Sequence, residues 1–219
     1  MTLIITIQGN IGGGKSTFLN HLKTLYKDNL NICFLQEPVE EWLSIRDTSG
    51  VSILELFYAE QHKYAFSFQM MAYISRLAIL KKAFNSGYEI IISERSLETD
   101  RNIFEKMLYD DDKITHIEHQ IYSKWFDTFK YDFPEEYVFY MHTTPQIIYE
   151  RIQKRDRKGE LIPLEYLKTC HVYHETWVDS LPLDRVSIID GNVDFNDEPE
   201  ILNLWVSQLQ SFINKCIPL

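Results

Sequence analysis

The chain has 219 residues, of which 45% are hydrophobic, and its formal net charge is −10 at pH 7. This length and apolar content predict a single domain over residues 1–219 with a well-filled core, and the negative charge argues against long-range attraction to nucleic acid or to an anionic membrane. We find no apolar run that is long enough to span a bilayer and no N-terminal signal or transit peptide, so we expect a cytoplasmic protein.

Short β-branched runs alternate along the chain with longer helical patterns. In chain order, strands are predicted at residues 3–8, 31–35, 89–93, 137–142 and 186–190. Helices are predicted at residues 16–27, 66–84, 145–158 and 198–215. This alternation predicts an α/β fold of three layers, in which a five-stranded parallel sheet is covered by helices on both faces. Ligands of such sheets bind beyond the carboxyl ends of the strands.

The first predicted strand leads directly into the sequence GNIGGGKS at residues 9–16. Gly9, Gly14, Lys15 and Ser16 match the pattern G-x-x-x-x-G-K-[ST] between a strand and a helix, which is the context that a phosphate loop requires. In such a loop the backbone N–H groups surround phosphate oxygens, the lysine reaches the β- and γ-phosphates, and the serine hydroxyl binds Mg²⁺. The motif predicts a polyphosphate site, but it occurs in GTPases, motor ATPases and small-molecule kinases alike.

Charged residues follow the second and third predicted strands. Glu37 comes after the strand at 31–35, and Glu94 and Arg95 come after the strand at 89–93. A kinase needs a carboxylate that orients the acceptor hydroxyl and takes its proton, and Glu37 is suited to this role. Glu94 is suited to support Mg²⁺, and Arg95 to hold the transferring phosphoryl group. Each carboxylate alone would be interpreted as a surface charge, but the pair opposite a phosphate loop favours phosphoryl transfer.

The segment ERIQKRDRKGE at residues 150–160 is the strongest basic cluster in this acidic chain. Arg151 and Arg155 lie about one helical turn apart and share a helix face. A lid that closes over ATP needs such arginines to neutralise charge on the transferred group. We therefore predict a helical lid at about residues 151–160, although a solvated helix with internal ion pairs would be the simpler interpretation without the phosphate loop.

Two polar residues, Gln69 and Arg76, interrupt the apolar pattern of the predicted helix at 66–84 and share one of its faces. A buried glutamine needs hydrogen-bond partners, and its adjacent donor and acceptor match the edge of a nucleobase. The alternative is a pair of polar core groups whose partners are other protein atoms.

Taken together and in this order, the motifs resemble the deoxyribonucleoside kinase family, which includes the deoxycytidine and deoxyguanosine kinases. The resemblance covers nearly the whole chain, through GNIGGGKST, EPVEEW, FSFQ with SR, ERS with DRNIF, RIQKRDR, IPLEYL with HETW, and DGNVDF. It implies a fold of the phosphate-loop NTPase type and transfer of the ATP γ-phosphoryl group, with Mg²⁺, to the 5′-hydroxyl of a deoxyribonucleoside in nucleotide salvage. It also implies a homodimer, for which the apolar region 66–80 would supply an interface.

The resemblance also implies roles for individual residues. Glu37 resembles the catalytic base, with Arg95 and Lys15 beside it, and Ser16 and Glu94 resemble the Mg²⁺ site. The implied ATP-binding residues are Gly9, Asn10, Ile11, Gly12, Gly13, Gly14, Lys15, Ser16 and Thr17, the lid arginines Arg151, Arg155 and Arg157, and Asp194 with Phe195 at the adenine. The implied nucleoside-binding residues are Trp42, Leu54, Phe57 and Phe68 in the pocket wall, Gln69 at the base edge, Phe104 on the base face, Tyr58 and Glu175 at the sugar 3′-hydroxyl, and Glu37, Arg76, Arg95 and Asp100.

Arg76 and Asp100 bear on base specificity. They match an Arg/Asp pair of the deoxycytidine and deoxyguanosine kinase branch, at positions where thymidine-accepting relatives have smaller apolar residues. The pair would crowd the space that a thymine methyl group occupies, and leaving either charge unpaired is costly. We therefore expect deoxycytidine, deoxyadenosine or deoxyguanosine to be favoured over thymidine, with the order among these three left open.

Three other interpretations compete with this one. A nucleoside monophosphate kinase of the thymidylate type shares the phosphate loop and lid, but it needs cations at the acceptor phosphate, where EPVEEW places acid. A non-catalytic nucleotide-binding scaffold subunit predicts the loss of catalytic positions, whereas Lys15, Glu37 and Arg95 are present. The histidine pairs at 116–119 and 171–174 have zinc-ligand spacing, although no cysteine lies at a matching distance and HETW belongs to the kinase resemblance.

Overall fold

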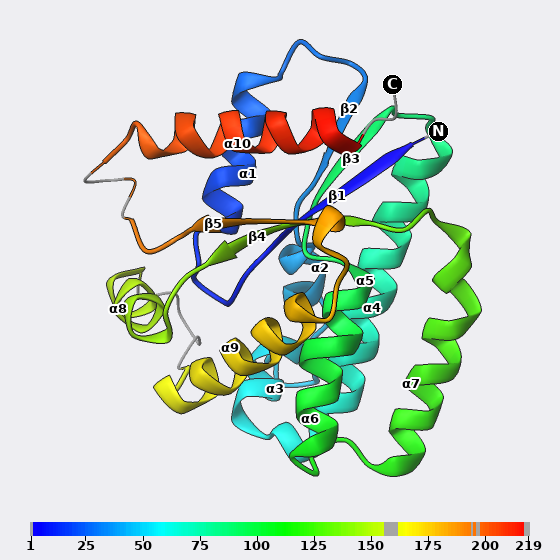
Figure 1. The fold of residues 1–219 in the computed structure, drawn as a ribbon. Coiled ribbons are helices and arrows are strands. Elements are labelled where there is room, and N and C mark those ends of the chain that lie inside the picture. The colour runs from blue at the N-terminus through cyan, green and yellow to red at the C-terminus, as the bar shows by residue number, and fades with distance from the viewer. Residues whose placement is uncertain (1, 156–161, 194, 196–197, 217–219) are drawn as a thin grey trace.

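One parallel sheet forms the centre of the molecule (Figure 1). The computed structural model describes residues 2–155, 162–193, 195 and 198–216. The strand order is β2-β3-β1-β4-β5, and every neighbouring pair is parallel. This confirms the predicted five-stranded parallel sheet and each strand to within one residue of its expected bounds. The strands are β1 (Leu3–Gln8), β2 (Ile32–Leu35), β3 (Ile90–Glu94), β4 (Tyr137–His142) and β5 (Val186–Asp190).

Helices cover both faces of this sheet, as Figure 1 shows. Successive side chains of a strand point to opposite faces. Ile5 of β1 packs with Phe18 and Trp205 on one face, and Ile4 packs with Ala83 on the other. Burying each large apolar side chain contributes about 1.5–3 kcal/mol to folding. The first face carries α1 (Lys15–Leu25) and α10 (Ile201–Cys216), and the second carries α4 (Gln61–Asn85) and α9 (Leu164–Asp179) among others.

The predicted helices are confirmed, but several further helices were missed. The predicted helix at 145–158 corresponds to α8, which is described as far as Arg155. Two of the missed helices, α3 and α7, begin with capping boxes, Ser52 with Glu55 and Thr115 with Glu118. These S/T-x-x-E signals were visible in the sequence. The bounds of α8 are Pro145–Arg155. The elements that were not predicted are α2 (Val39–Ser44), α3 (Ile53–Ala59), α5 (Leu97–Thr99), α6 (Lys106–Asp110), α7 (His116–Phe129), α9 (Leu164–Asp179) and the 3₁₀ turns Lys130–Asp132 and Leu183–Arg185.

A π-helical segment, η1 (Asp100–Glu105), joins α5 to α6. Ser96 starts this run of helix by accepting a hydrogen bond from the Thr99 backbone N–H. Single π-helical turns are rare and occur often at functional sites. Here the segment carries Asp100 and Phe104, which are both buried.

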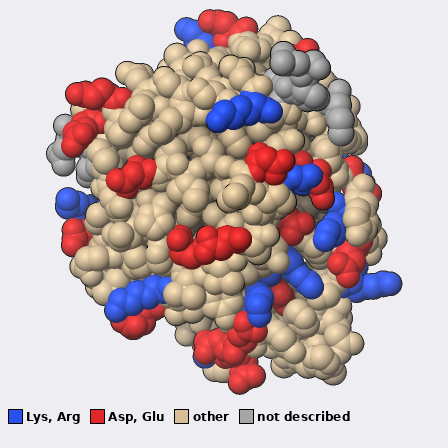
Figure 2. All heavy atoms as spheres, in the orientation of Figure 1, with Lys and Arg blue, Asp and Glu red and all other residues tan. Residues whose placement is uncertain are grey.

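The surface carries charges of both signs. Figure 2 shows the acidic and basic side chains of the described residues interspersed over one face. No helix in the described ranges has the length and apolarity that a bilayer span requires.

Candidate active site

The phosphate loop joins β1 to α1, and its glycines set its shape. Gly9 has a φ of +144°, and a Cβ atom there would lie 2.7 Å from the Met141 carbonyl oxygen. Only glycine therefore allows the loop to leave β1 this close to β4. Gly14 has a φ of +92° and is the residue from which α1 begins, with no side-chain cap among the described residues. The uncapped N–H groups at the start of α1 suit an anion.

Two polar side chains fix the loop in place. The amide N–H of Asn10 donates to the Leu167 carbonyl of α9 at 2.8 Å, and its Oδ1 accepts from the Ile11 backbone N–H at 2.8 Å. The Lys15 ammonium donates to the Asn10 carbonyl at 2.7 Å. Asn10 is buried, so its side chain supports the loop from behind. The prediction that Asn10 contacts ATP stays a prediction, which its backbone rather than this side chain would fulfil.

Ser16 of α1 and Glu94 at the end of β3 meet in front of the loop. The Ser16 hydroxyl donates to Glu94 Oε1 at 2.6 Å. The other oxygen, Glu94 Oε2, is buried and has no hydrogen-bond partner among the described residues. A buried carboxylate oxygen without a partner is costly, and a carboxylate beside a hydroxyl is a donor set that Mg²⁺ accepts. The two residues fit the predicted metal site.

A cleft of about 720 Å³ opens over the phosphate loop. Arg151 of α8 lines it, and its guanidinium donates to the carbonyls of Gly191, Asn192 and Val193 at 2.8, 3.1 and 3.0 Å. This residue thus connects α8 to the segment after β5. The other predicted residues that line the cleft are Ile11, Gly12, Gly14, Lys15, Ser16, Thr17, Glu37, Glu94, Arg95 and Phe195. Lys154, which was not among the predicted site residues, also lines the cleft.

Some predicted ATP residues do not line this cleft. Gly9 and Gly13 contribute backbone geometry, because Cβ atoms there would approach Met141 and Asn10. The side chain of Arg155 and the residues Arg157 and Asp194 lie outside the described part of the chain, so their predicted roles stay predictions.

A second, smaller pocket of about 90 Å³ lies beside the cleft. Its wall is aromatic: the rings of Phe57 and Phe68 stack at a centroid distance of 4.6 Å, and Trp42 meets Phe68 edge-on at 5.4 Å. The Trp42 indole N–H donates to the Ser75 hydroxyl at 2.8 Å, which fixes the orientation of that ring. Predicted nucleoside residues that line this pocket are Glu37, Trp42, Leu54, Phe57, Tyr58, Phe68, Gln69, Arg76, Arg95, Asp100 and Phe104.

Four residues line both the cleft and the pocket, and we call them the shared wall: Ile11, Glu37, Val39 and Arg95. Arg95 has a φ of 61°, a left-handed conformation that costs a residue with a side chain about 1–2 kcal/mol. Its guanidinium lies 4.5 Å from the centre of the Phe104 ring. Its Nε is buried without a hydrogen-bond partner among the described residues and lies 3.7 Å from Glu37 Oε1. Strain and an unpartnered donor at one residue are features of functional sites.

Glu37 belongs to a buried charge network at this wall. The Arg76 guanidinium donates to Glu37 Oε1 at 2.9 Å, to Asp100 Oδ2 at 2.8 Å and to the Glu94 carbonyl at 2.8 Å. Burial raises the pKa of Glu37, but the positive charges of Arg95, Arg76 and Lys15 outweigh it and lower the pKa below its ordinary value. Glu37 is therefore ionised at neutral pH and can accept a proton.

One predicted sugar contact is wrong. Glu175 does not line the pocket; it accepts a hydrogen bond of 2.5 Å from the Tyr140 hydroxyl. It lies about two and a half turns beyond Tyr166 on α9, which places the two side chains on opposite faces of the helix. Tyr166, which the sequence analysis missed, is the α9 residue that lines the pocket.

Comparison with known proteins decides the family of the chain. Residues 5–214 match the family model described as deoxynucleoside kinase. The chain belongs to the deoxynucleoside kinase family. Deoxycytidine kinase from Mus musculus is 32% identical, with an alignment that covers 96% of this chain and 90% of the relative. A probable deoxycytidine kinase from fowlpox virus is 32% identical over 96% and 88% of the two chains, and the mitochondrial deoxyguanosine kinase from Xenopus laevis is 29% identical over 80% and 72%.

Family membership confirms the predicted activity class. The chain is an ATP-dependent deoxynucleoside kinase of nucleotide salvage, and a nucleoside is its acceptor. The two pockets differ in their chemistry: the cleft presents backbone N–H groups and cations, whereas the pocket presents aromatic rings.

Proposed function

We propose that this kinase transfers the ATP γ-phosphoryl group to the 5′-hydroxyl of a deoxyribonucleoside held in the aromatic pocket. The observation that carries the proposal is the position of Glu37 and Arg95, which line both the phosphate cleft and the aromatic pocket. A group that must act on the atom passed between two reactants has to reach both of them.

The phosphate loop would hold the donor. The N–H groups at the start of α1 would surround the phosphates, with Lys15 at the transferred group. Ser16 and Glu94 would hold Mg²⁺, which supplies charge neutralisation of the polyphosphate when bound. Arg151, with Arg155 and Arg157, would act from the lid at about residues 151–160, and Asp194 with Phe195 would hold the adenine; the residues beyond 155 in this lid and Asp194 lie outside the described part of the chain.

The aromatic pocket would hold the acceptor. Gln69 is buried in its wall and would pair with the base edge, while Phe104 would stack on the base face. Tyr58 would contact the sugar. Tyr166 joins this set, and burial raises the pKa of its hydroxyl, which keeps it protonated as a hydrogen-bond donor.

Glu37 would act as the general base. Its ionised carboxylate accepts the 5′-hydroxyl proton as the O5′–Pγ bond forms and the bond from Pγ to the leaving ADP oxygen breaks. Arg95 would hold the phosphoryl oxygens during transfer, since it lines both the cleft and the pocket and its buried Nε has no hydrogen-bond partner among the described residues. The excess negative charge leaves on ADP, beside Lys15.

We further propose that deoxycytidine and the purine deoxyribonucleosides are favoured over thymidine. Arg76 and Asp100 lie in the pocket wall, and both are buried. Arg76 Nε lies 2.8 Å from Asp100 Oδ2. A thymine methyl group that displaced either one would leave a buried charge unpaired. The names of the relatives, deoxycytidine and deoxyguanosine kinases, are consistent with this preference.

A homodimer is also proposed, built on an exposed apolar face. Ile117, Ile121 and Trp125 recur at one-turn spacing on α7 and are 71%, 42% and 46% exposed, and Ile74 of α4 is 47% exposed. We expect Ile121→Glu to convert the dimer to a monomer in light scattering. Leu183→Glu is the matched control, because Leu183 is an apolar residue that is 95% exposed and belongs to neither α4 nor α7. An Ile121→Glu protein that stays dimeric would place the interface elsewhere.

Steady-state phosphorylation with Mg-ATP tests the function directly. Deoxycytidine, deoxyadenosine, deoxyguanosine, thymidine and dCMP would be compared as acceptors under one set of conditions. Activity on deoxycytidine or the purines with little on thymidine is the expected result. Strong thymidine activity would contradict the specificity argument, and activity only on dCMP would indicate a monophosphate kinase. Nucleotide binding without any turnover would support a scaffold.

A further inference from the structure

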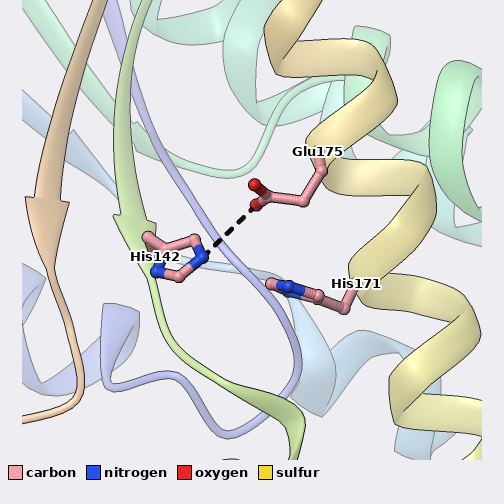
Figure 3. A group of neighbouring side chains, drawn as sticks. All are labelled: His142, His171 and Glu175. Atoms are coloured by element: carbon pink, nitrogen blue, oxygen red, sulfur yellow. Dashed lines mark ion pairs between the residues drawn. The ribbon is translucent and has the colours of Figure 1, made fainter.

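Three side chains of metal-ligating types, His142, His171 and Glu175, lie close together (Figure 3), and none of them lines the cleft or the pocket. His142 is the last residue of β4, and His171 and Glu175 lie one turn apart on α9. The His142 Nε2 atom lies 3.9 Å from Glu175 Oε1, and the two imidazole rings have centroids 5.3 Å apart. One ligand atom of each residue lies within 4.8 Å of the other two, and this is the one such group found among the described residues.

We propose that His142, His171 and Glu175 form a binding site for a divalent transition-metal ion, with Zn²⁺ as the preferred ion. Two imidazole nitrogens and one carboxylate oxygen are a donor set of zinc sites that keep one position open to solvent. Imidazole ligands select zinc and its neighbours over Mg²⁺, which prefers oxygen donors. The site is therefore chemically distinct from the oxygen set of Ser16 and Glu94.

The ligand atoms of the three side chains would need to move only slightly closer together to bind an ion. Zinc bonds of about 2.0–2.2 Å in a tetrahedron place neighbouring ligand atoms about 3.4 Å apart. The His142 to Glu175 distance of 3.9 Å is already close to this value. Their side chains are 35% and 38% exposed, so rotation of both is open, and α9 presents His171 and Glu175 on one face.

Polar groups around the cluster support this assignment. His171 Nδ1 is buried without a hydrogen-bond partner among the described residues, as expected for a nitrogen whose partner is an ion. The Tyr140 hydroxyl donates to Glu175 Oε1 at 2.5 Å and orients the carboxylate. Hydrogen bonds of this kind to a ligating carboxylate are typical of metal sites.

The structure changes the zinc pairing that the sequence spacing indicated. His174 does not join His171; it is fully buried, its Nδ1 lies 2.7 Å from the Cys170 carbonyl, and its ring stacks on Tyr140. The other sequence pair is also divided, since His116 contacts Tyr109 and His119 contacts Glu105. The partner of His171 on its own helix is Glu175, one turn later.

An ion at this site would join two elements that support the active site. The Met141 carbonyl of β4 lies directly behind Gly9 of the phosphate loop, and the Leu167 carbonyl of α9 holds Asn10 of the same loop. A link between β4 and α9 would therefore make the two elements that contact the phosphate loop more rigid. Because an ion that binds only the folded state stabilises it by mass action, saturation at a hundredfold excess over Kd would raise Tm by about 5–10 °C.

The test uses the full chain without an affinity tag, freed of metal by a chelator and without nucleotide. Zn²⁺ would be titrated in calorimetry, Co²⁺ would be followed by visible absorption, and Tm would be recorded with and without each ion. We expect one equivalent of Zn²⁺ to bind and Tm to rise. His171→Ala should weaken Zn²⁺ binding at least about tenfold, whereas His62→Ala, an exposed histidine beside Lys113, should leave it unchanged.

Glu175→Gln guards against a folding defect, because glutamine can still accept the hydrogen bond from Tyr140. It should fold, as judged by circular dichroism, and lose the Co²⁺ absorption. Absence of stoichiometric binding by the wild-type chain would overturn the proposal, as would equal affinity in wild type, His171→Ala and Glu175→Gln. None of these readouts depends on turnover, so either result leaves the kinase function untouched.

Discussion

The phosphate cleft and the nucleoside pocket are neighbours with opposite construction. The cleft measures about 720 Å³ and is lined by loop backbone and by cations such as Lys15 and Arg151. The pocket measures about 90 Å³ and is walled by rings from α2, α3, α4 and the π-helical segment. A polyphosphate is recognised by charge and N–H groups, which a short loop supplies locally, whereas a base is recognised by shape, which needs several packed elements. Glu37 lines both the cleft and the pocket.

Replacement of Glu37 gives the largest expected effect, because this residue serves both pockets. Glu37→Gln keeps the shape of the side chain and removes the carboxylate that we propose as the base. We expect kcat to fall by about 10²–10⁴-fold, with nucleoside affinity changed little. Steady-state kinetics and nucleoside calorimetry would measure the two quantities. Glu41→Gln, at an exposed position in α2, the helix that begins two residues after Glu37, is the control, and near-normal kcat for Glu37→Gln would remove it as the base.

Replacement of Lys15 should weaken the use of ATP in the cleft and leave nucleoside binding in the pocket unchanged. Lys15→Met removes a cation at the phosphate loop, so we expect kcat/KM for ATP to fall by about 10²–10³-fold. Nucleoside binding in the absence of ATP should be unchanged, because Lys15 does not line the pocket. Calorimetry with nucleoside alone checks this, with the exposed Lys27→Met as control. An equal loss of nucleoside affinity would mean that the two pockets are not independent.

The Arg76–Asp100 pair should decide which base the pocket accepts. Replacing both with apolar residues, Arg76→Met with Asp100→Ala, opens the wall without leaving either partner charged alone. We expect the ratio of kcat/KM for thymidine over deoxycytidine to rise at least about tenfold. Parallel assays of the two nucleosides measure the ratio.

The single variants are the controls for this pair. Arg76→Met alone leaves Asp100 without its ion-pair partner and leaves Glu37 with the more distant Arg95, so the free energy of unfolding should fall by about 3–5 kcal/mol. Urea unfolding would measure it. An unchanged thymidine ratio in a folded double variant would show that the pair does not exclude the methyl group.

The smallest effect is expected in the pH dependence. The charges of Arg95, Arg76 and Lys15 hold the pKa of Glu37 below its ordinary value despite burial, so the fall of kcat/KM at acid pH that belongs to Glu37 should occur below the pH at which an ordinary glutamate titrates. The same depressed pKa stabilises the fold above this pH, and that contribution is lost as the pH falls through the folded pKa. Arg76→Met should move this fall to higher pH, and an unmoved fall would assign it to another group.

The sequence predicted the cleft more completely than the surroundings of the pocket, and locality explains why. The phosphate loop is one continuous motif whose neighbours are a strand and a helix, so its geometry follows from short-range rules. The strands were predictable because buried parallel strands are short continuous apolar runs. The residues of the pocket wall came from resemblance to a family. Their placement rests on α2 and the π-helical segment, which short-range patterns did not reveal, and on α3, whose capping box was visible in the sequence but was not used to predict a helix.

The errors also have a physical origin. Glu175 was assigned to the sugar by family resemblance alone, and α9 was not predicted as a helix. In that helix a half-turn of phase moves a side chain to the opposite face, which separates Glu175 from the pocket that Tyr166 lines. The histidine spacing of 171–174 was equally misleading, because the partner that completes the cluster, His142, comes from a strand that is distant in sequence.

The shared wall offers a route by which the binding of one ligand can change the affinity for the other. If nucleoside moves Ile11, Glu37, Val39 or Arg95 toward the position that ATP prefers, ATP affinity rises, and thermodynamic reciprocity requires ATP to raise nucleoside affinity by the same factor. The ratio of the two dissociation constants with and without the other ligand, measured with a non-hydrolysable ATP analogue, gives that factor directly. The four residues of the shared wall would then carry the coupling free energy between donor binding and acceptor binding.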